Sequence, residues 1–513
     1  MIAQYGALGK AEAAFSNMME FVKQAIETNE LRIDEVERAL FDHLLVVGRH
    51  TLQGFIDAAG DGNHGETVEH DGKTLHRSED RKTKFYRSIF GVLSVERYVY
   101  ASGPKKKVEW APVDARLSLP AGEQSYVLED WMLRVCVKES FEEGVGSLRD
   151  LLGVNTSVRA AEIMTRNMAE HADSFSETKA APDPGTEEEI IVLSADGKGV
   201  PMRRPLAERL KEHQKEHQAA ATSEESSAED CLSVHEESAS PKKKRLGPGE
   251  KRTRKQMAYV GAVYSIAPFV RTPDQVVDEL RRKERQADRP RPQNKQVFAE
   301  MTRFREGEVI NGQVRCFARL ALLAISRLVC TKTLICLMDG QRSLWNLKES
   351  WFPRAIGVLD LFHVMERLWQ VAHAFHGDGT REAESQVTHH LRLLLEGKVS
   401  FVIGVYKRML NDYNLTGKPA ATVRDTITYF QNNKQFMKYH EYLAKGYPIG
   451  TGVVEGACRH FVKDRMELAG MRWEIEGAQA MLSLRALYLN DQWDAFIEHR
   501  IQTEQHSLYA LAA

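Results

Sequence analysis

Three short apolar runs, each followed by an aspartate, constrain the fold of this chain most strongly. The runs are 189–195, 333–338 and 355–359, and the aspartates after them are Asp196, Asp339 and Asp360. Runs of this length and composition are typical of strands buried on both faces of a sheet. In open α/β sheets, ligands bind beyond the strand ends. We therefore predict an α/β core that carries carboxylates at its ligand-binding edge.

Each aspartate also has a structural explanation, because Asp is common in turns and as the N-cap of a helix. Asp196 and Asp339 both precede a glycine, and Glu455 follows the Gly/Pro-rich turn 448–452. Two aspartates and a glutamate without a His/Cys cluster suit Mg²⁺ or Mn²⁺ better than zinc. Asp360 competes with Asp339 for the place of the second metal ligand, and the residues alone do not separate them.

A helical pattern begins directly after the turn 448–452, where Thr451 suits the N-cap position. Helical spacing places Glu455 at the border of the apolar stripe, one turn before Arg459 and two before Lys463. This arrangement fits a metal-binding carboxylate with basic groups beside it for phosphate. It also fits a glutamate favoured by the helix dipole, with ordinary ion pairs along the helix.

The composition excludes several classes of protein. A chain of 513 residues is too long for one ordinary core, so we expect two or three domains. The six cysteines lack CxxC spacing, which argues against a zinc knuckle and fits a reducing cytosol. We find no signal peptide, and the most apolar stretch, 316–338, is interrupted by Arg and Lys. We therefore expect a cytoplasmic protein.

Changes in pattern along the chain predict its domains. In the N-terminal part we expect a helical segment at 1–60, a basic β-hairpin region at 61–120 and helices at 121–180 with a helix-turn-helix-like arrangement. We expect the catalytic core at 187–360, with a disordered acidic and basic insertion at 205–255. A helical insertion at 361–447 then precedes a return to the core at 448–513, whose C-terminal helices carry the glutamate. Within the core we expect two strands in 257–270 and helices from there to about residue 327. The basic hairpins suit either phosphate contacts or a charged edge strand, and any pair of helices resembles helix-turn-helix.

Three stretches together resemble the transposases of the ISKra family of bacterial insertion sequences. They are DGKGVPMR from Asp196, LDLFHVMERLW from Leu359 and PIGTGVVEGACRH from Pro448, followed by VKDRM at 462–466 and GMRW at 470–473. The similarity runs from about residue 80 to 490. It implies a DDE transposase with an RNase H-like catalytic core, a mixed sheet with flanking helices that an α-helical insertion interrupts. It also implies an N-terminal α+β DNA-binding region.

The resemblance assigns roles to individual residues. Asp196, Asp339 and Glu455 correspond to the catalytic carboxylates that hold two Mg²⁺ (or Mn²⁺) ions. The sequence from Asp360 to His363 is similar to the C/D-x-x-H motif of Mutator-like and hAT transposases, which gives these two residues supporting roles. The basic residues expected to contact DNA are Lys198, Arg459, Lys463, Arg465 and Arg472.

The implied function is binding of terminal inverted repeats, metal-dependent strand cleavage and transfer of the 3′-hydroxyl into target DNA. Because two ends are joined, we expect a homodimer or larger assembly, near the bacterial nucleoid. Two alternatives stay open. One is a structure-specific nuclease of the RNase H fold, and the other is a domesticated, non-catalytic DNA-binding protein.

Overall fold

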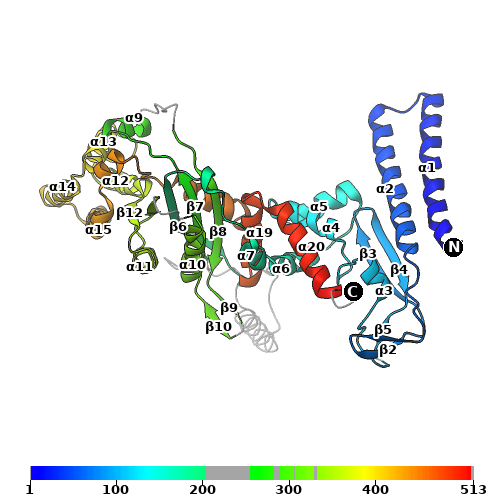
Figure 1. Ribbon diagram of the computed structural model, residues 1–513. Coiled ribbons are helices and arrows are strands. Elements are labelled where there is room, and N and C mark those ends of the chain that lie inside the picture. The colour runs from blue at the N-terminus through cyan, green and yellow to red at the C-terminus, as the bar shows by residue number, and fades with distance from the viewer. Residues whose placement is uncertain are drawn as a thin grey trace, which may run out of the picture. The chain divides into compact units, whose positions relative to one another are not determined.

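The chain forms two compact units in a computed structural model (Figure 1). The structure describes residues 2–104, 106–203, 255–281, 289–305, 307–327, 332–468 and 470–509. The first unit contains residues 1–179 and 491–513, and the second contains 180–490. The predicted disordered insertion 205–255 lies outside the described residues, except for Lys255, which begins a strand. No helix in the described ranges is long and apolar enough to cross a membrane.

The first unit combines a long helical hairpin, two small antiparallel sheets and a group of short helices. Its elements are α1 (Ile2–Thr28), α2 (Ile33–Asp57), β1 (Thr67–His70), β2 (Lys73–Arg77), β3 (Lys82–Ser88), β4 (Gly91–Arg97), β5 (Tyr100–Ala101), α3 (Pro112–Arg116), α4 (Tyr126–Cys136), α5 (Phe141–Leu152), α6 (Val158–Ala169), α7 (Ala172–Thr178) and α20 (Trp493–Tyr509). Both predicted hairpins are confirmed. Asp71 and Gly72, both with positive φ, connect β1 to β2, and Ser88 pairs with Gly91 where β3 turns into β4.

Two basic side chains of the predicted β-hairpin region 61–120 bond within the first unit and stabilise it. Arg97 is buried and binds Asp114 through two hydrogen bonds, of 2.6 and 2.9 Å. The Lys84 ammonium donates to the Pro120 carbonyl at 2.6 Å and lies 3.6 Å from the same aspartate. Arg97 and Lys84 therefore have a structural role. Phosphate contact by the β-hairpin region stays a prediction for its exposed residues, such as Arg81 and Lys82.

The helices α5 and α6 have the predicted helix-turn-helix-like connection. Ser140 caps the start of α5, and Gly153 ends it in the left-handed conformation that glycine adopts without strain. Arg159, Arg166 and Asn167 are exposed on α6. DNA binding by this N-terminal region stays a prediction.

The C-terminal helix α20 belongs to the first unit, so the assignment of residues 491–513 to the core was wrong. The physical reason is its buried face. The Trp493 indole donates to Asp130 at 2.6 Å, Arg500 forms an ion pair with Glu129, and Phe496 packs edge-on against Phe175. The sequence of α20 alone does not reveal this buried face, because it is defined by contacts with α4 and α7.

The second unit is built on a mixed five-stranded sheet in the order β12-β11-β6-β7-β8 (Figure 1). The strands are β6 (Ile190–Pro201), β7 (Lys255–Ile266), β8 (Gln293–Met301), β11 (Thr333–Met338) and β12 (Ile356–Leu359). The strands β6, β7 and β8 pair antiparallel, while β11 is parallel to both β6 and β12. The three predicted apolar runs are thus neighbouring parallel strands, and the predicted α/β core is confirmed in this general form.

Three details of the sheet differ from the predictions. β6 does not end at Ala195 but continues through Asp196 to Pro201, because β7 pairs with it along its whole length. β7 is one strand where two were expected in 257–270. β8 lies in a region predicted to be helical, because the polar first half of QNKQVFAEM hides its strand character.

Helices and short strands complete the second unit. They are η1 (Pro184–Thr186), α9 (Pro273–Arg281), β9 (Arg303–Arg305), β10 (Glu308–Ile310), α10 (Gly312–Ile325), α11 (Arg342–Trp351), α12 (Leu361–His376), α13 (Arg381–Leu395), α14 (Val399–Asp412), α15 (Gly417–Asn433), η2 (Lys434–Phe436), α16 (Tyr439–Ala444), α17 (Gly452–Ala457), the π-helical turn η3 (Cys458–Lys463), α18 (Asp464–Met466) and α19 (Ile475–Leu489). Helix α10 packs on β7 and β8.

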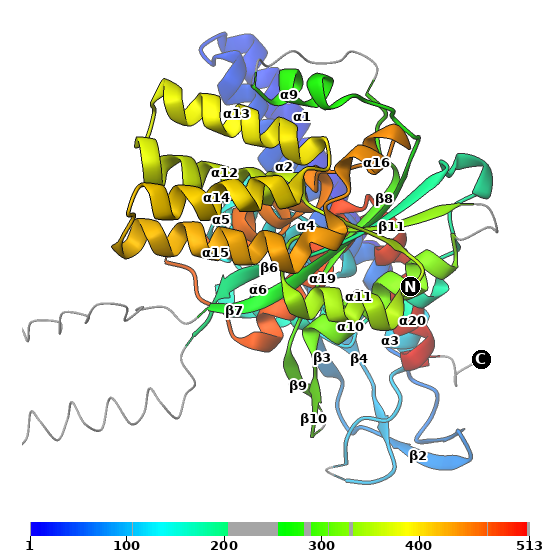
Figure 2. The same cartoon turned by 90° about the vertical axis from the view of Figure 1, so that its left-hand side faces the viewer.

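The predicted helical insertion 361–447 forms a layered group of helices. Figure 2 shows α12, α13, α14 and α15 side by side, and each packs on its neighbours through apolar residues that are almost fully buried. The group also contacts the loop after β11, because the Tyr429 ring of α15 lies directly on Gly340. The insertion therefore helps to hold the residue next to Asp339.

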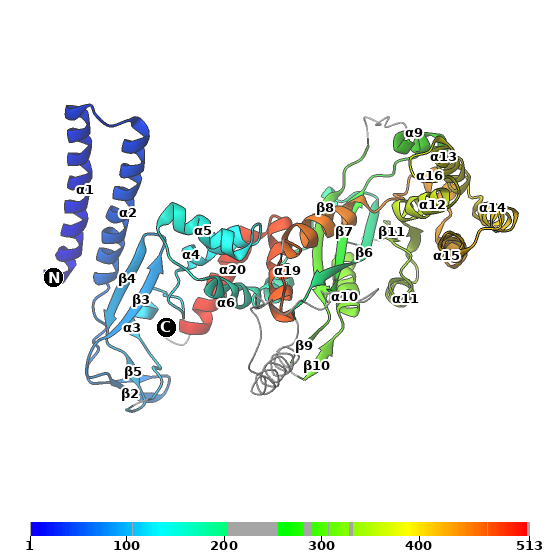
Figure 3. The same cartoon turned by 180° about the vertical axis from the view of Figure 1, so that it is seen from behind.

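Helix α19 lies beside β8, the edge strand at one end of the sheet, and covers this edge (Figure 3). The Gln479 amide accepts from Met301 N at 2.8 Å and donates to Ala299 O at 3.1 Å. The Asn490 amide binds Val297 N and O in the same way, each at 2.8 Å. These side chains occupy backbone groups that would otherwise pair with another strand.

The close contact at Gly340 predicts a stability loss. A Cβ at this position would lie 2.1 Å from a ring carbon of Tyr429, so Gly340→Ala must displace α15 or the loop after β11. We expect a loss of about 1–3 kcal/mol, measured from the thermal midpoint. Gly404→Ala in α14 is the matched control, since nothing lies within 4 Å of its added Cβ. Equal midpoints for the two variants would contradict this packing.

Candidate metal-binding and catalytic site

The sheet register brings the three predicted aspartates to one level. Leu193 of β6 pairs with Cys336 of β11, and Asp196 and Asp339 each lie three residues further along their chains. Asp339 and Asp360 each follow the last pair between β11 and β12, Met338 with Leu359. Residues at one level of parallel strands are neighbours. The predicted strand-end carboxylates therefore form one acidic group.

Asp360 is the most buried and most fully bonded member of this group. It is 0% exposed and caps α12: one carboxylate oxygen accepts from His363 N at 3.0 Å and contacts His363 Nδ1 at 2.7 Å. The other oxygen accepts from Thr451 N at 2.7 Å. With both oxygens bound to protein donors, Asp360 fits a supporting role better than that of a second metal ligand.

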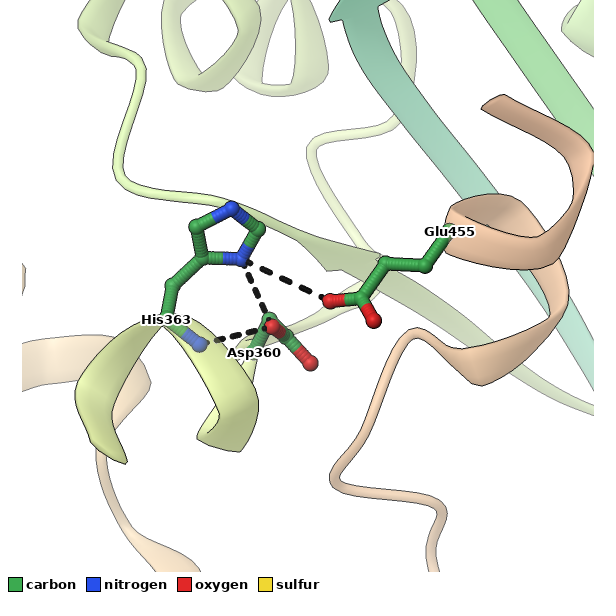
Figure 4. A group of neighbouring side chains, drawn as sticks. All are labelled: Asp360, His363 and Glu455. Carbon is green, nitrogen blue, oxygen red and sulfur yellow. Dashed lines mark hydrogen bonds and ion pairs between the residues drawn. The ribbon is translucent and has the colours of Figure 1, made fainter. Parts of the chain in front are cut away.

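Glu455 points toward Asp360 and His363 from the first turn of α17 (Figure 4). Its carboxylate accepts from the Thr451 hydroxyl at 3.1 Å and lies 3.9 Å from His363 Nδ1. Thr451 thus connects the two acids, since its backbone binds Asp360 and its side chain binds Glu455. The Gly/Pro-rich turn places this threonine and the glutamate that follows it.

Asp339 and Asp196 retain more freedom than Asp360. Asp339 accepts from Gln341 N at 3.0 Å, and the Trp345 indole fixes its backbone by donating to its carbonyl at 2.7 Å. Asp196 accepts from Gly197 N at 2.6 Å and from the Cys458 thiol at 3.2 Å. Both carboxylates are partly exposed, as ligands that receive an ion must be.

The charges of these groups act on one another. Burial, together with the negative charge of Asp196, raises the pKa of Asp339. Burial and the charge of Asp360 raise the pKa of Glu455. In the opposite sense, the hydrogen bond to Asp360 raises the pKa of His363 to about 9, so its ring is an imidazolium at neutral pH. The site therefore favours added positive charge.

Two groupings of metal ligands have to be compared. In the described part of the chain, the ligand atoms of Asp360, His363 and Glu455 lie within 4.8 Å of one another. The ligand atoms of Asp196, Asp339 and Glu455 do not all lie this close together in the described structure. However, both oxygens of Asp360 already accept hydrogen bonds from the protein, and His363 Nδ1 lies 2.7 Å from one of them. Asp196, Asp339 and Glu455 supply only oxygen donors, which fits Mg²⁺ or Mn²⁺. We therefore retain the latter set as the candidate ligands, with Asp360 and His363 in support.

The residues predicted to bind DNA differ in exposure. Arg459, Lys463 and Arg472 are exposed and Lys198 is partly exposed, so their DNA contacts stay predictions. Arg465 is fully buried, with its guanidinium 5.1 Å from the centre of the Trp473 ring. It is therefore not available to a phosphate, contrary to the prediction.

Arg465 lies four residues after Phe461 and seven after Cys458, on the helical face of these two buried residues, and the π-helical turn η3 precedes it. The carbonyls of His460 and Phe461, within this turn, accept hydrogen bonds from the buried Arg485 of α19. The sequence contains no signal that predicts such a turn.

Four residues of the site were missed in the sequence. Cys458, Trp345 and Gln341 bond to the acids or their backbone, and Tyr429 packs on Gly340, next to Asp339. Cys458 and Gln341 lie within three residues of predicted acids, so proximity was an available signal. For Tyr429 and Trp345 no local signal exists.

In comparisons with known proteins, no family model matches this chain, and no curated protein matches its sequence. The function therefore has to be argued from the site itself.

The elevated pKa of His363 predicts how stability depends on pH. The folded value of about 9 lies above the ordinary 6.5, so the imidazolium stabilises the protein fully below about 6.5. This contribution is lost as pH rises through about 9. Thermal midpoints of wild type and His363→Gln should therefore differ most at pH 6 and converge by pH 10. His373→Gln, exposed on the same helix, is the control. A pH-independent difference between wild type and His363→Gln would contradict the ion pair.

The raised pKa values of Asp339 and Glu455 predict a response to divalent cations. The folded state holds protons on these acids more tightly than the unfolded chain does, so the free energy of unfolding falls as pH rises and the acids ionise. A bound cation offsets the repulsion between the ionised carboxylates. At pH 8, Mg²⁺ or Mn²⁺ at about 100 times its Kd should stabilise the wild type by about 2.7 kcal/mol. Asp339→Asn should raise the metal-free midpoint and weaken the response, whereas the distant Asp412→Asn should leave both unchanged. If neither Mg²⁺ nor Mn²⁺ changed the thermal midpoint of the wild type, the proposed metal site would be contradicted.

Proposed function

We propose that this protein is a DNA transposase of the DDE type, with an RNase H-like catalytic core in its second unit. The observation that carries the proposal is the common level of Asp196, Asp339 and Asp360 on three parallel strands, with Glu455 brought beside them by a distant helix. Together with the resemblance to ISKra transposases, this supports Asp196, Asp339 and Glu455 as the catalytic carboxylates.

The sheet supports the proposed RNase H-like core. An RNase H-like sheet has three antiparallel strands followed by two strands parallel to the first, in the spatial order 3-2-1-4-5. The order β8-β7-β6-β11-β12 and its strand directions agree with that description. The first acid then lies on the first strand and the second directly after the fourth, while the third lies on a later helix.

The residues of this chain would perform separate tasks in cleavage. Asp196, Asp339 and Glu455 would hold Mg²⁺ ions, which activate the attacking water or 3′-hydroxyl and stabilise the leaving oxygen of a phosphodiester. Asp360 and Thr451 fix the position of Glu455. The His363 imidazolium would place a positive charge beside the acids at neutral pH, where it stabilises the negative charge of a phosphate oxygen.

Carboxylate variants test the proposal in a cleavage assay with labelled DNA that carries the element's end. Asp196→Asn, Asp339→Asn and Glu455→Gln should each bind this DNA but cut it more than about 100-fold more slowly, since even the outer partners of metal ligands contribute about 10- to 100-fold. Glu366→Gln, exposed on α12, should cut normally. Normal cleavage by Asp339→Asn would exclude the assigned triad.

The same assay separates the alternatives. A structure-specific nuclease would cut with the same carboxylates but yield no strand-transfer product. A domesticated DNA-binding protein would bind the DNA and cut it in neither the wild type nor any variant.

A further inference from the structure

A second basic site lies in the helical insertion, among residues that the acidic group does not use. A cavity of about 590 Å³ opens between the end of α15, η2, the start of α16 and the loop at Gly397, with Arg342 of α11 at its wall. Its charged and titratable lining residues are Arg342, Lys434, Lys438 and His440, all exposed. None of the described lining residues carries a carboxylate.

The positive charge of this cavity is not neutralised within the described chain. Among the ion pairs of the described chain, none includes Arg342, Lys434 or Lys438. Glu396, next to the lining residue Gly397, is already paired, because its carboxylate binds Lys398 at 2.7 Å. Glu441 lies 3.9 Å from His440 and is the acid paired with a lining residue. Three unpaired cations around one cavity predict an anionic ligand.

The other lining residues indicate which anion. Gln431, Asn432 and Gln435 add amide groups, which together with Arg and Lys form the usual contacts to DNA phosphates. The described lining residues include no Phe, Tyr or Trp, the rings that most often stack on a base in nucleotide recognition, and the His440 imidazole is the ring among them. We infer that this cavity binds the phosphodiester backbone of DNA, as a second DNA contact of the transposase proposed above, on which the inference rests.

This cavity is mechanically connected to Asp339. Phe436 of η2, next to the lining residue Gln435, stacks on Trp345 with ring centroids 3.7 Å apart and planes within 9°. The same Trp345 indole holds the Asp339 carbonyl. DNA bound in the cavity would therefore be held by the same rigid group that positions a catalytic acid.

The test is DNA binding by the full chain in metal-free buffer, where no cleavage occurs. Fluorescence anisotropy with two duplexes of unrelated sequence, over a series of KCl concentrations, compares wild type with Lys434→Ala/Lys438→Ala. We expect weaker binding to both duplexes, and a slope of log K against log[salt] smaller by about 1 for each lysine. The control is Lys407→Ala/Arg408→Ala, two exposed cations of α14 outside the cavity, which should keep the wild-type slope.

The outcomes separate this inference from the proposed function. If wild type binds and cuts DNA while the Lys434/Lys438 variant has the wild-type slope and affinity, this inference fails and the proposed function stands. If wild type binds no DNA, both fail. If inorganic phosphate or a nucleoside triphosphate displaces the duplex where KCl of equal ionic strength does not, the cavity is a small-anion site and the DNA assignment is overturned.

Discussion

The carboxylate of Asp360 joins three parts of the second unit that are far apart in sequence. It ends β12, caps α12 and receives the backbone N–H of Thr451 from the turn before α17. A fully buried carboxylate is tolerable only when donors satisfy both of its oxygens, as they do here. Loss of this side chain would leave buried N–H groups without an acceptor and would release the turn that carries Glu455. The position of Glu455 therefore depends on Asp360.

The acidic group stores electrostatic free energy that the fold does not need for its own stability. Burial and mutual repulsion raise the pKa of Asp339 and of Glu455, whereas the imidazolium of His363 offsets part of this negative charge. Groups perturbed in this way gather at functional sites more often than elsewhere. The proton of this imidazolium is stabilised by Asp360, so an ion that used the His363 ring as a ligand would have to displace it.

The sequence predicted the parts of this site that have a local signal. β11 was predicted at its observed limits, and Asp339-Gly340 directly follows its last residue, whereas Asp196-Gly197 lies within β6. The common level of Asp196 and Asp339 could not be predicted, because it depends on how β6 and β11 pair. The DNA contact of Arg465, which the resemblance implied, was predicted wrongly, because this side chain is fully buried against the Trp473 ring. Strand β8 was missed because its burial results from α10 and α19, and its own residues do not reveal it.

The long separation of Asp339 from Glu455 has a structural purpose beyond that of a spacer. A longer connection adds little to the entropic cost of bringing its ends together, because that cost grows only with the logarithm of length. This connection also forms a core of its own, and α15 returns Tyr429 to Gly340, next to the second acid. Arg367 of α12 lies 4.9 Å from the centre of the same tyrosine ring. The insertion thus contacts the loop after β11 through Tyr429, and its residue Phe436, next to the basic cavity, stacks on Trp345. The insertion therefore supports the surroundings of Asp339, through Tyr429 on Gly340 and through Phe436 on Trp345.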